Sequence, residues 1–352
     1  MHRMIDGMNM AWSDRNKYLA DPDWVDIPVR YENDEYCEQF TSSATCPAGC
    51  GWNRADGGSE EGKYLTGTRG ELRGCRSIGL LSKDYANARR DRFSSLFKIA
   101  QVPLPPGNFS SIADDTWLAD YKDKVGTTHL SVIDRWGNMV SMTTTIEENL
   151  GTGIVVKGRG FLLNNELTDF SFNSKTGSGS GYANRPEGGK RTRRTALGQD
   201  AQTFGGKRPR SSMTPTIVLT PDGKPFLAIG TPGGGRITYT VFNALLAILD
   251  RNETLKEAID APRCISMNGV TELESAYNCN CSSALPQDRY LVSALRARGL
   301  QFTTSPSSST SPYLEAALLR PDASLSCYAD QQRMQTAQAF CEGKLDVSGW
   351  KK

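Results

Sequence analysis

The sequence predicts a mixed α+β protein, and three segments carry that prediction. Residues 126–146 alternate polar and apolar side chains on both sides of a turn sequence, which is typical of a β-hairpin. Residues 225–230 form an apolar run that continues through glycines into the apolar stretch 237–250, the pattern of a buried strand followed by a helix. At the start of the chain, one face of an amphipathic helix is predicted by the spacing of Met4, Ile5, Met8 and Trp12.

Composition allows a sizeable core and gives no strong electrostatic signature. The 352 residues are 38% hydrophobic, and the net charge is +2. A basic run at 190–194 lies in a Gly/Ser-rich stretch, so residues 172–205 are predicted to form a flexible loop, either a mobile cover or an idle surface insertion. No aromatic residues interleave with the basic ones, which disfavours nucleic-acid binding. The sequence has no run of the roughly 20 apolar residues that a membrane-spanning helix needs.

The predicted hairpin places two threonines opposite each other. Asp134 to Asn138 carry the turn residues, and a turn centred on Trp136 pairs Thr127 with Thr145, because antiparallel partners sum to a constant residue number. A threonine that follows Gly126 then has a hydroxyl neighbour. An ordinary threonine-rich hairpin is the alternative, and the hairpin by itself favours it because threonine is a good strand former.

A threonine hydroxyl needs a base before it can act as a nucleophile. A free α-amino group, with a pKa near ~8, is one accepted base. Using it requires cleavage before Thr127, and Gly126 tolerates the twisted peptide that self-cleavage needs. Only His2 and His129 could supply an imidazole, and His129 is expected to be a packed strand residue. The scarcity of histidine therefore favours the amine as base.

The glycines at 233–235 follow the predicted strand and precede the helix. Unpaired N–H groups beside a helix N-terminus favour negative charge, which is what an oxyanion hole requires. A phosphate cradle uses similar parts, but the Lys-Ser/Thr pair that ends a P-loop is missing.

The chain resembles the gamma-glutamyltransferase family, also called glutathione hydrolases, through five motifs in the family's order: GTTHLSVID, GTGIVVKGRGFLLNNELTDFS, KRPRSSMTPTIVL, GTPGGGRI and EAIDAPR. Residues 4–29 look like the last helix and exit of that family's large subunit. The resemblance covers most of the chain except roughly residues 31–110 and 172–205. It implies a four-layer αββα sandwich of the N-terminal nucleophile hydrolase type.

The resemblance also implies roles for individual residues. Thr127 would be the self-processing and catalytic nucleophile, with Gly126 as the other side of the cleaved bond and Thr145 bonded to the freed amine. Backbone N–H groups of Gly233 and Gly234 would stabilise the oxyanion. The substrate's α-carboxylate would bind Ser211 and Ser212, and its α-ammonium would bind Glu166 and Asp169, a division that suits the donors and acceptors concerned.

Two departures from the family pattern leave the substrate open. Glu147 stands where the family usually has asparagine, so a third carboxylate joins Glu166 and Asp169. The family's carboxylate-binding arginine lies far upstream in the large subunit, before this chain starts. We therefore expect an incomplete precursor, either a fragment or a chain whose upstream half is supplied separately. Residues 1–126 would be the remnant of the large subunit, and residues 127–352 the small catalytic subunit.

The implied reaction is cleavage of γ-glutamyl amides such as glutathione, with transfer of the γ-glutamyl group to water or to an acceptor amino acid or dipeptide. The processed halves would stay associated as a heterodimer, and no metal or organic cofactor is implied. Two alternatives remain: an acylase for another amide such as a glutaryl group, and a pseudoenzyme or fragment that binds partners through its cysteine-rich insertion.

Nine cysteines are many for a cytosolic enzyme of this size, so disulfides are predicted. A zinc site is the weaker alternative, because no paired CxxC spacing or nearby histidine accompanies the first cluster. Three glycosylation sequons, at Asn108, Asn252 and Asn280, agree with a secretory route to the cell surface or exterior, although the chain shows no signal peptide or anchor. Seven of the nine cysteines form two clusters: Cys37, Cys46, Cys50 and Cys75, then Cys264, Cys279 and Cys281.

Overall fold

The structure is a computed structural model that describes residues 1–21, 50–53, 74–77, 80, 83–93, 104, 126–171, 184–186, 191–192, 203–204, 206–267, 271–274, 293–300, 303–305, 312–334 and 336–341. No helix within these ranges is long and apolar enough to cross a membrane.

A four-stranded antiparallel sheet forms the centre of the described part, in the order β13-β12-β8-β7. Its strands are β7 (Thr216–Leu219), β8 (Pro225–Gly230), β12 (Glu315–Leu319) and β13 (Leu325–Ala329). The predicted strand at 225–230 is confirmed, and it is the most buried of the four. Gly223, at φ 80°, makes the tight turn between β7 and β8.

The predicted hairpin is also confirmed, as β3 (Thr127–Ile133) and β4 (Met139–Thr145). Its register runs from Thr127 opposite Thr145 to Ile133 opposite Met139, as the turn centre predicts. The Asp134 carboxylate fixes the turn by accepting hydrogen bonds from the N–H groups of Trp136 and Asn138, both at 2.9 Å.

One face of this hairpin packs on the central sheet. The Ser131 hydroxyl donates to the Glu315 carbonyl at 3.1 Å, and the Ser141 hydroxyl donates to the Ile229 carbonyl at 3.0 Å. The His129 ring lies so close to Gly230 that a Cβ there would overlap it, which explains the glycine at the end of β8. Two sheets are therefore stacked face to face.

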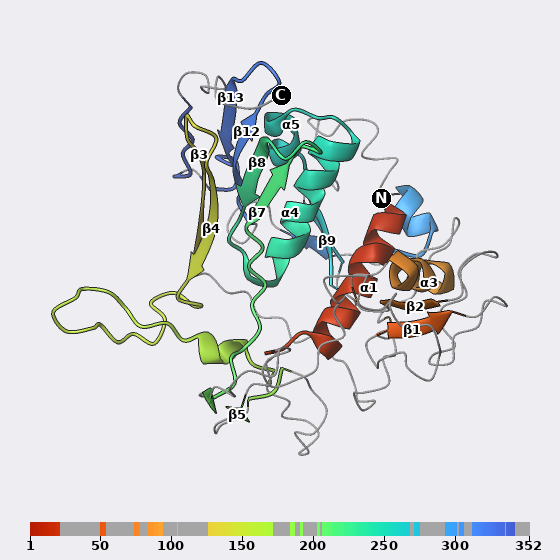
Figure 1. Ribbon diagram of the computed structural model, residues 1–352, viewed down its shortest axis with the longest axis horizontal. Helices are drawn as coiled ribbons and strands as arrows, with labels where there is room; N and C mark the ends of the chain where they lie inside the picture. The colour runs from red at the N-terminus through yellow and green to blue at the C-terminus, as the bar shows by residue number, and fades with distance from the viewer. Residues whose placement is uncertain are drawn as a thin grey trace.

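Helices cover the other face of the central sheet, as Figure 1 shows. They are α4 (Ile237–Leu245) and α5 (Leu255–Asp260). The helix predicted over 237–250 is present, but its last part, Leu246–Asp250, is π-helical. The short α5 begins with a capping box between Thr254 and Glu257. Hairpin, sheet and helices form three consecutive layers of the expected αββα sandwich.

The first helix, α1 (His2–Tyr18), packs against β9 (Cys264–Ser266). As predicted, Ile5, Met8 and Trp12 are buried on one face. Strand β9 belongs to a small sheet with β10 (Thr271–Glu274) and β11 (Thr303–Ser305). Helix α3 (Lys83–Phe93) lies beside α1, and β1 (Cys50–Asn53) pairs with β2 (Gly74–Ser77). In the predicted flexible loop, β5 (Arg191–Thr192) pairs with β6 (Thr203–Phe204).

The cysteines only partly follow the prediction. A disulfide joins Cys327 and Cys341, a pair that the two sequence clusters do not contain. Cys264, which the sequence groups with Cys279 and Cys281, is a free thiol that is fully buried between β9 and α1, and burial raises its pKa to about 12. Cys37, Cys46, Cys279 and Cys281 lie outside the described residues.

Candidate functional site

The two threonines predicted to face each other are in hydrogen-bond contact. The Thr127 hydroxyl donates to the Thr145 hydroxyl oxygen at 2.9 Å. Thr145 in turn donates to the carbonyl oxygen of Gly126 at 3.3 Å and accepts from the Glu147 N–H at 2.8 Å. One hydroxyl therefore joins the side chain of Thr127 to the peptide bond that precedes it.

The Gly126 carbonyl has a second donor, the N–H of Ile146 at 3.1 Å. Two donors on one carbonyl oxygen stabilise negative charge that develops there. The position has no room for a side chain, because a Cβ on Gly126 would lie 2.6 Å from the Glu147 carbonyl oxygen and 2.7 Å from that of Glu148. Glycine at 126 is therefore required by close packing of the backbone.

Three carboxylate side chains lie close together in space near the end of β4. One oxygen from each of Glu147, Glu166 and Asp169 lies within 4.8 Å of the other two. Glu147 is 4% exposed and has the unusual φ of 76°, which turns the chain sharply after the threonine pair. Glu166 and Asp169 lie on the 3-10 turn η2 (Glu166–Asp169), whose Thr168 hydroxyl donates to Glu147 at 2.9 Å. The arrangement concentrates negative charge beside Thr145.

The two predicted serines differ in their surroundings. Ser211 is exposed, and its oxygen accepts from the N–H of Met213 at 3.2 Å. Ser212 is half-buried and its oxygen accepts from a guanidinium nitrogen of Arg15, on α1, at 2.5 Å. The Ser212 carbonyl accepts from Thr238 on α4 at 3.4 Å, so this serine lies between two helices.

Asn184 connects the serine segment to the carboxylates. Its amide nitrogen donates to the Asp169 carbonyl at 2.8 Å, and its amide oxygen accepts from the N–H of Arg210 at 2.9 Å. The side chain is fully buried. Asn184 therefore holds η2 and the residues before Ser211 at a fixed separation.

The glycine turn follows β8 as predicted. Gly233 and Gly234 have φ values of 133° and 56°, and a Cβ on Gly233 would lie 2.5 Å from the Pro312 side chain. Within the described part of the chain, neither N–H has a hydrogen-bond acceptor. The turn is connected to the start of β3 through Tyr313, whose phenol lies against Thr128 and whose carbonyl accepts from Thr231 at 2.6 Å.

His129 is a packed strand residue with no exposed face for proton transfer. Its ring nitrogens bond the hydroxyls of Thr143 and Ser131 at 2.8 and 2.9 Å, and burial lowers its pKa to about 4. It is 4% exposed. Neutral imidazole is therefore part of the contact between hairpin and sheet.

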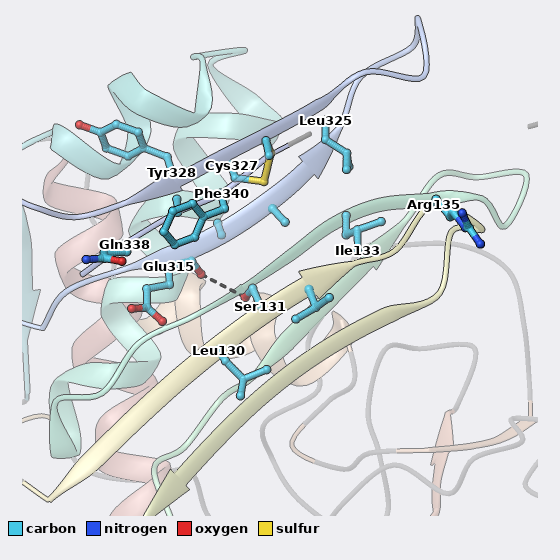
Figure 2. A pocket seen from close by; sticks show the side chains of 15 residues that line it. Leu130, Ser131, Ile133, Arg135, Glu315, Leu325, Cys327, Tyr328, Gln338 and Phe340 are labelled. Carbon is cyan, nitrogen blue, oxygen red and sulfur yellow. Dashed lines mark hydrogen bonds between the residues drawn. A yellow bond between two sulfur atoms is a disulfide. The ribbon is translucent and has the colours of Figure 1, made fainter. Parts of the chain in front are cut away.

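A pocket of about 350 Å³ lies elsewhere, between β3 and strands β12 and β13. Figure 2 shows Glu315 and Phe340 on its walls, with Cys327 of the disulfide beside them. Burial raises the pKa of Glu315. None of the predicted site residues lines this pocket, so it is separate from the threonine pair.

Sequence reasoning missed Arg15 and Asn184. The bond from Arg15 to Ser212 spans 197 residues. Arg15 belongs to a helix for which the sequence pattern predicts only the apolar face. Asn184 lies in the Gly/Ser-rich stretch that predicts a flexible loop. The residue types alone carry no local signal for either contact.

Comparison with known proteins places this geometry in a family. The sequence model of the family described as gamma-glutamyltranspeptidase matches residues 75–198 and 199–340, and so includes much of the sequence that the five motifs leave out. The glutathione hydrolase proenzyme of Bacillus subtilis strain 168 is 31% identical over 316 residues, which cover 86% of this chain and 38% of that protein. The acylase ACY 1 proenzyme of Pseudomonas sp. strain SE83 is 30% identical over 229 residues, covering 64% and 32%.

The fold is shared with a solved acylase. The crystal structure of cephalosporin acylase from Bacillus halodurans superposes on 97% of this chain and 45% of its own, with a TM-score of 0.60 and 18% identity. This chain therefore has the N-terminal nucleophile hydrolase fold, and it spans less than half the length of the curated relatives it matches. With the family model matching well over half of its residues, the chain belongs to the gamma-glutamyltranspeptidase family.

Proposed function

We propose that this chain is a self-processing threonine enzyme that cleaves γ-glutamyl amides, glutathione and its conjugates among them. The observation that carries the proposal is the hydrogen-bonded series from Thr127 through Thr145 to the Gly126 carbonyl. It joins a nucleophile, a proton acceptor and the carbonyl that would be attacked. Each donor to a developing oxyanion contributes roughly 3–4 kcal/mol to transition-state stabilisation.

Self-cleavage is the first reaction. The Thr127 oxygen attacks the Gly126 carbonyl carbon, and the donors from Ile146 and Thr145 stabilise the oxyanion. The C–N bond breaks, an ester to the threonine oxygen remains, and the nitrogen takes up the proton that the hydroxyl lost and leaves as the amine of Thr127. Water hydrolyses the ester, which gives a carboxylate on Gly126 and restores the hydroxyl of Thr127.

The freed amine then serves as base for its own side chain. The threonine oxygen attacks the γ-carbonyl of the substrate, N–H groups of Gly233 and Gly234 stabilise the oxyanion, and the leaving amine takes the proton. Water or an acceptor amino acid or dipeptide releases the γ-glutamyl group. The carboxylates near Thr145 would bind the α-ammonium, and Ser211 and Ser212 the α-carboxylate.

Incubation of the purified full chain tests the proposal. The wild type is expected to split into residues 1–126 and 127–352, with Thr127 as the new N-terminus by sequencing. Thr127→Ala should stay intact, and Gly126→Ala should fail to cleave because its Cβ meets the Glu147 carbonyl. Thr144→Ala, on the exposed side of β4, is the matched control and should cleave normally. An uncut wild type without turnover of a γ-glutamyl anilide contradicts the proposal.

A second candidate function is an acylase for amides without an α-ammonium, such as glutaryl amides. Similarity to the Pseudomonas acylase supports it, and like-charge repulsion from Glu147 would favour it by disrupting recognition of an ammonium. Three carboxylates favour a cation, so they also support the γ-glutamyl substrate. Self-cleavage followed by turnover of glutaryl anilide alone would select the acylase.

We also propose that residues 1–126 and 127–352 remain associated after cleavage as the two subunits of a heterodimer. Trp12, Ile5 and Met8 on α1 share one core with Cys264 and Leu273. These apolar contacts stabilise the pair without the peptide bond. The two products should elute together in size-exclusion chromatography, and separate elution in native buffer would contradict the association.

A further polypeptide layer is proposed on the outer face of the hairpin. Leu130 lies opposite Met142 and Val132 opposite Val140, and all four side chains are exposed. Exposed apolar faces of this kind mark contact surfaces.

We also propose a secretory, extracellular route, with which the exposed sequon at Asn252 is consistent. This is tested by measuring whether glycosidase treatment lowers the mass of the protein isolated from its source.

A further inference from the structure

We propose that the pocket between β3 and strands β12 and β13 binds an organic ammonium ion with an apolar body, whose cationic end is recognised by the Glu315 carboxylate and the Phe340 ring. The pocket volume of about 350 Å³ is within the range of small-molecule sites, which begins at roughly 300 Å³. This site is separate from the threonine pair, and ligand binding there needs no scission at Gly126.

Glu315 brings an unpaired carboxylate to one end of the pocket. It is the first residue of β12, and its backbone carbonyl accepts from the Ser131 hydroxyl at 3.1 Å, which fixes its main chain against β3. The side chain is half-buried, and within the described residues it has neither a hydrogen bond nor an ion pair. Burial accordingly raises the pKa of Glu315. A cation that enters the pocket would pair with this carboxylate and offset the free energy that its burial costs.

Phe340 places an aromatic ring beside that carboxylate. Figure 2 shows the two side chains at the same end of the pocket. The Phe340 side chain is 82% exposed, the largest exposed fraction among the large apolar side chains of the described residues. The face of an aromatic ring attracts a cation, and a carboxylate accepts charge-assisted hydrogen bonds from an ammonium. The ring and the carboxylate therefore offer two different attractions to the same group.

The rest of the pocket suits an apolar body. Its walls carry aliphatic side chains from β3 and β13, among them Ile133 and Leu325 (Figure 2). Arg135 lies at the opposite end from Glu315, with its guanidinium carbon 4.1 Å from the centre of the Trp136 ring. The positive charge of Arg135 makes that end unfavourable for a cation. The two ends therefore orient the ligand, with its ammonium group at Glu315.

A disulfide holds the outer wall of the pocket in place. Residues 338–341 form this wall, and the bond from Cys327 on β13 to Cys341 ties it to the central sheet. Phe340 directly precedes Cys341, so the covalent link restricts where the aromatic ring can lie. A group that is held in place before the ligand arrives loses less conformational freedom on binding. Affinity for the cation should therefore depend on this disulfide.

Calorimetric titration of the full chain with phenethylamine tests the site. This amine is protonated at neutral pH, and phenethyl alcohol has nearly the same shape without the charge. The amine should bind at least about 10-fold more tightly than the alcohol, the effect of a charged hydrogen bond. Glu315→Gln should weaken binding of the amine by about 10- to 100-fold, toward the affinity of the alcohol. The midpoint of thermal unfolding of this variant should not fall, because Glu315 has no partner to lose within the described residues.

Three further variants locate the contacts. Phe340→Ala should weaken binding of the amine by about 3- to 10-fold, the contribution of an aromatic face to a cation. Cys341→Ser removes the tether and should weaken binding in the same direction. Asp250→Asn removes an exposed carboxylate from the end of the helix after the glycine turn. It is the matched control and should bind the amine as wild type does.

The carboxylate cluster near Thr145 is the competing site for an amine, and Asp169→Asn distinguishes the two. Asp169→Asn should bind phenethylamine as wild type does. The proposal is overturned if the amine binds no more tightly than the alcohol, or if Glu315→Gln binds it as tightly as wild type. A loss in Asp169→Asn as large as that in Glu315→Gln would also contradict it. These measurements concern binding alone, so an uncut, inactive wild type would refute the proposed function and leave this test intact.

Discussion

Charged side chains gather in two regions of this molecule, and they are arranged in opposite ways. Between α5, β10 and the segment after β13, two arginines and two carboxylates form one closed network: Arg263, Arg333, Glu274 and Asp330. In the candidate site, three carboxylates lie together and Arg15 lies apart from them. The first set pairs opposite charges in direct contact, whereas in the second set the like charges lie together and no carboxylate of the described residues lies within 4.0 Å of the Arg15 guanidinium.

The closed network is satisfied in detail. Asp330 accepts from Arg263 at 2.5 Å and from Arg333 at 2.9 Å, and it is fully buried. Burial by itself raises the pKa of Glu274, but its hydrogen bond with Arg333 outweighs this and leaves the pKa below its usual value. Arg263 also donates to the carbonyl of Pro312. Matched charges of this kind hold segments together.

The largest expected effect comes from breaking the closed network. Asp330→Ala removes the carboxylate between two buried guanidinium groups and should cost about 3–5 kcal/mol of unfolding free energy. Urea denaturation measures this. Asp222→Ala is the matched control, because the exposed pair of Asp222 with Lys224 is worth about 0–1 kcal/mol. If Asp330→Ala lowers the unfolding free energy no more than Asp222→Ala does, the distinction between the two regions is contradicted.

His129 tests how the core tolerates a buried group with no charged partner. Its pKa is about 4 in the folded chain and about 6.5 when unfolded. The stabilisation that the folded chain gains from a neutral His129 is fully present above pH 6.5. Between these values the unfolded chain binds a proton that the folded chain does not, so stability falls as the pH falls. The loss approaches about 1.4 kcal/mol per pH unit and roughly 3 kcal/mol at pH 4.

Denaturation at a series of pH values checks this for wild type and His129→Gln. The difference in unfolding free energy between the two should change with pH between 6.5 and 4 and should be constant above 7. Parallel pH profiles would show that His129 titrates normally in the folded chain.

Asn184→Ala should have a smaller effect on stability, and it should act within the candidate site by separating η2 from the serine segment. It leaves the Asp169 carbonyl and the Arg210 N–H without their partner, at a cost of about 1–3 kcal/mol. It should also lower kcat/KM for γ-glutamyl anilide, because η2 and the serine segment lose their fixed separation. Ser171→Ala removes only a 3.3 Å contact to Asn184 and serves as control. Unchanged stability would contradict the connecting role.

The smallest change in stability is expected for Asp169→Asn. This substitution removes one of three neighbouring like charges, so unfolding free energy should change by less than about 1 kcal/mol. Turnover of γ-glutamyl anilide should fall while that of glutaryl anilide should not. Thermal unfolding and initial rates measure the two effects. A destabilisation similar to that of Asp330→Ala would mean that these carboxylates are structural after all.

Local patterns in the sequence predict the local parts of this structure. The hairpin register follows from the turn residues around Trp136, and the contact between Thr127 and Thr145 follows from the register. Strand β8 and the helix after the glycine turn follow from apolar runs. The roles of the site residues remain predictions, since geometry alone does not test them.

Contacts between distant segments were not predictable in this way. Arg15 meets Ser212 only because α1 packs on β9, and nothing near either residue indicates that packing. The disulfide between Cys327 and Cys341 depends on the path of the chain after β13, which cysteine spacing does not give. Cys264 was grouped with its sequence neighbours, whereas its burial under α1 decides its chemistry.

The sealed thiol of Cys264 has a practical consequence for measurements on this protein. Because it is fully buried and its pKa is near 12, a maleimide or disulfide reagent can modify it only when α1 lifts from β9. Its rate of modification, followed by mass spectrometry of the peptide around residue 264, would report how often the first helix detaches. Comparing that rate before and after scission of the chain would show how strongly the covalent link holds α1 in place.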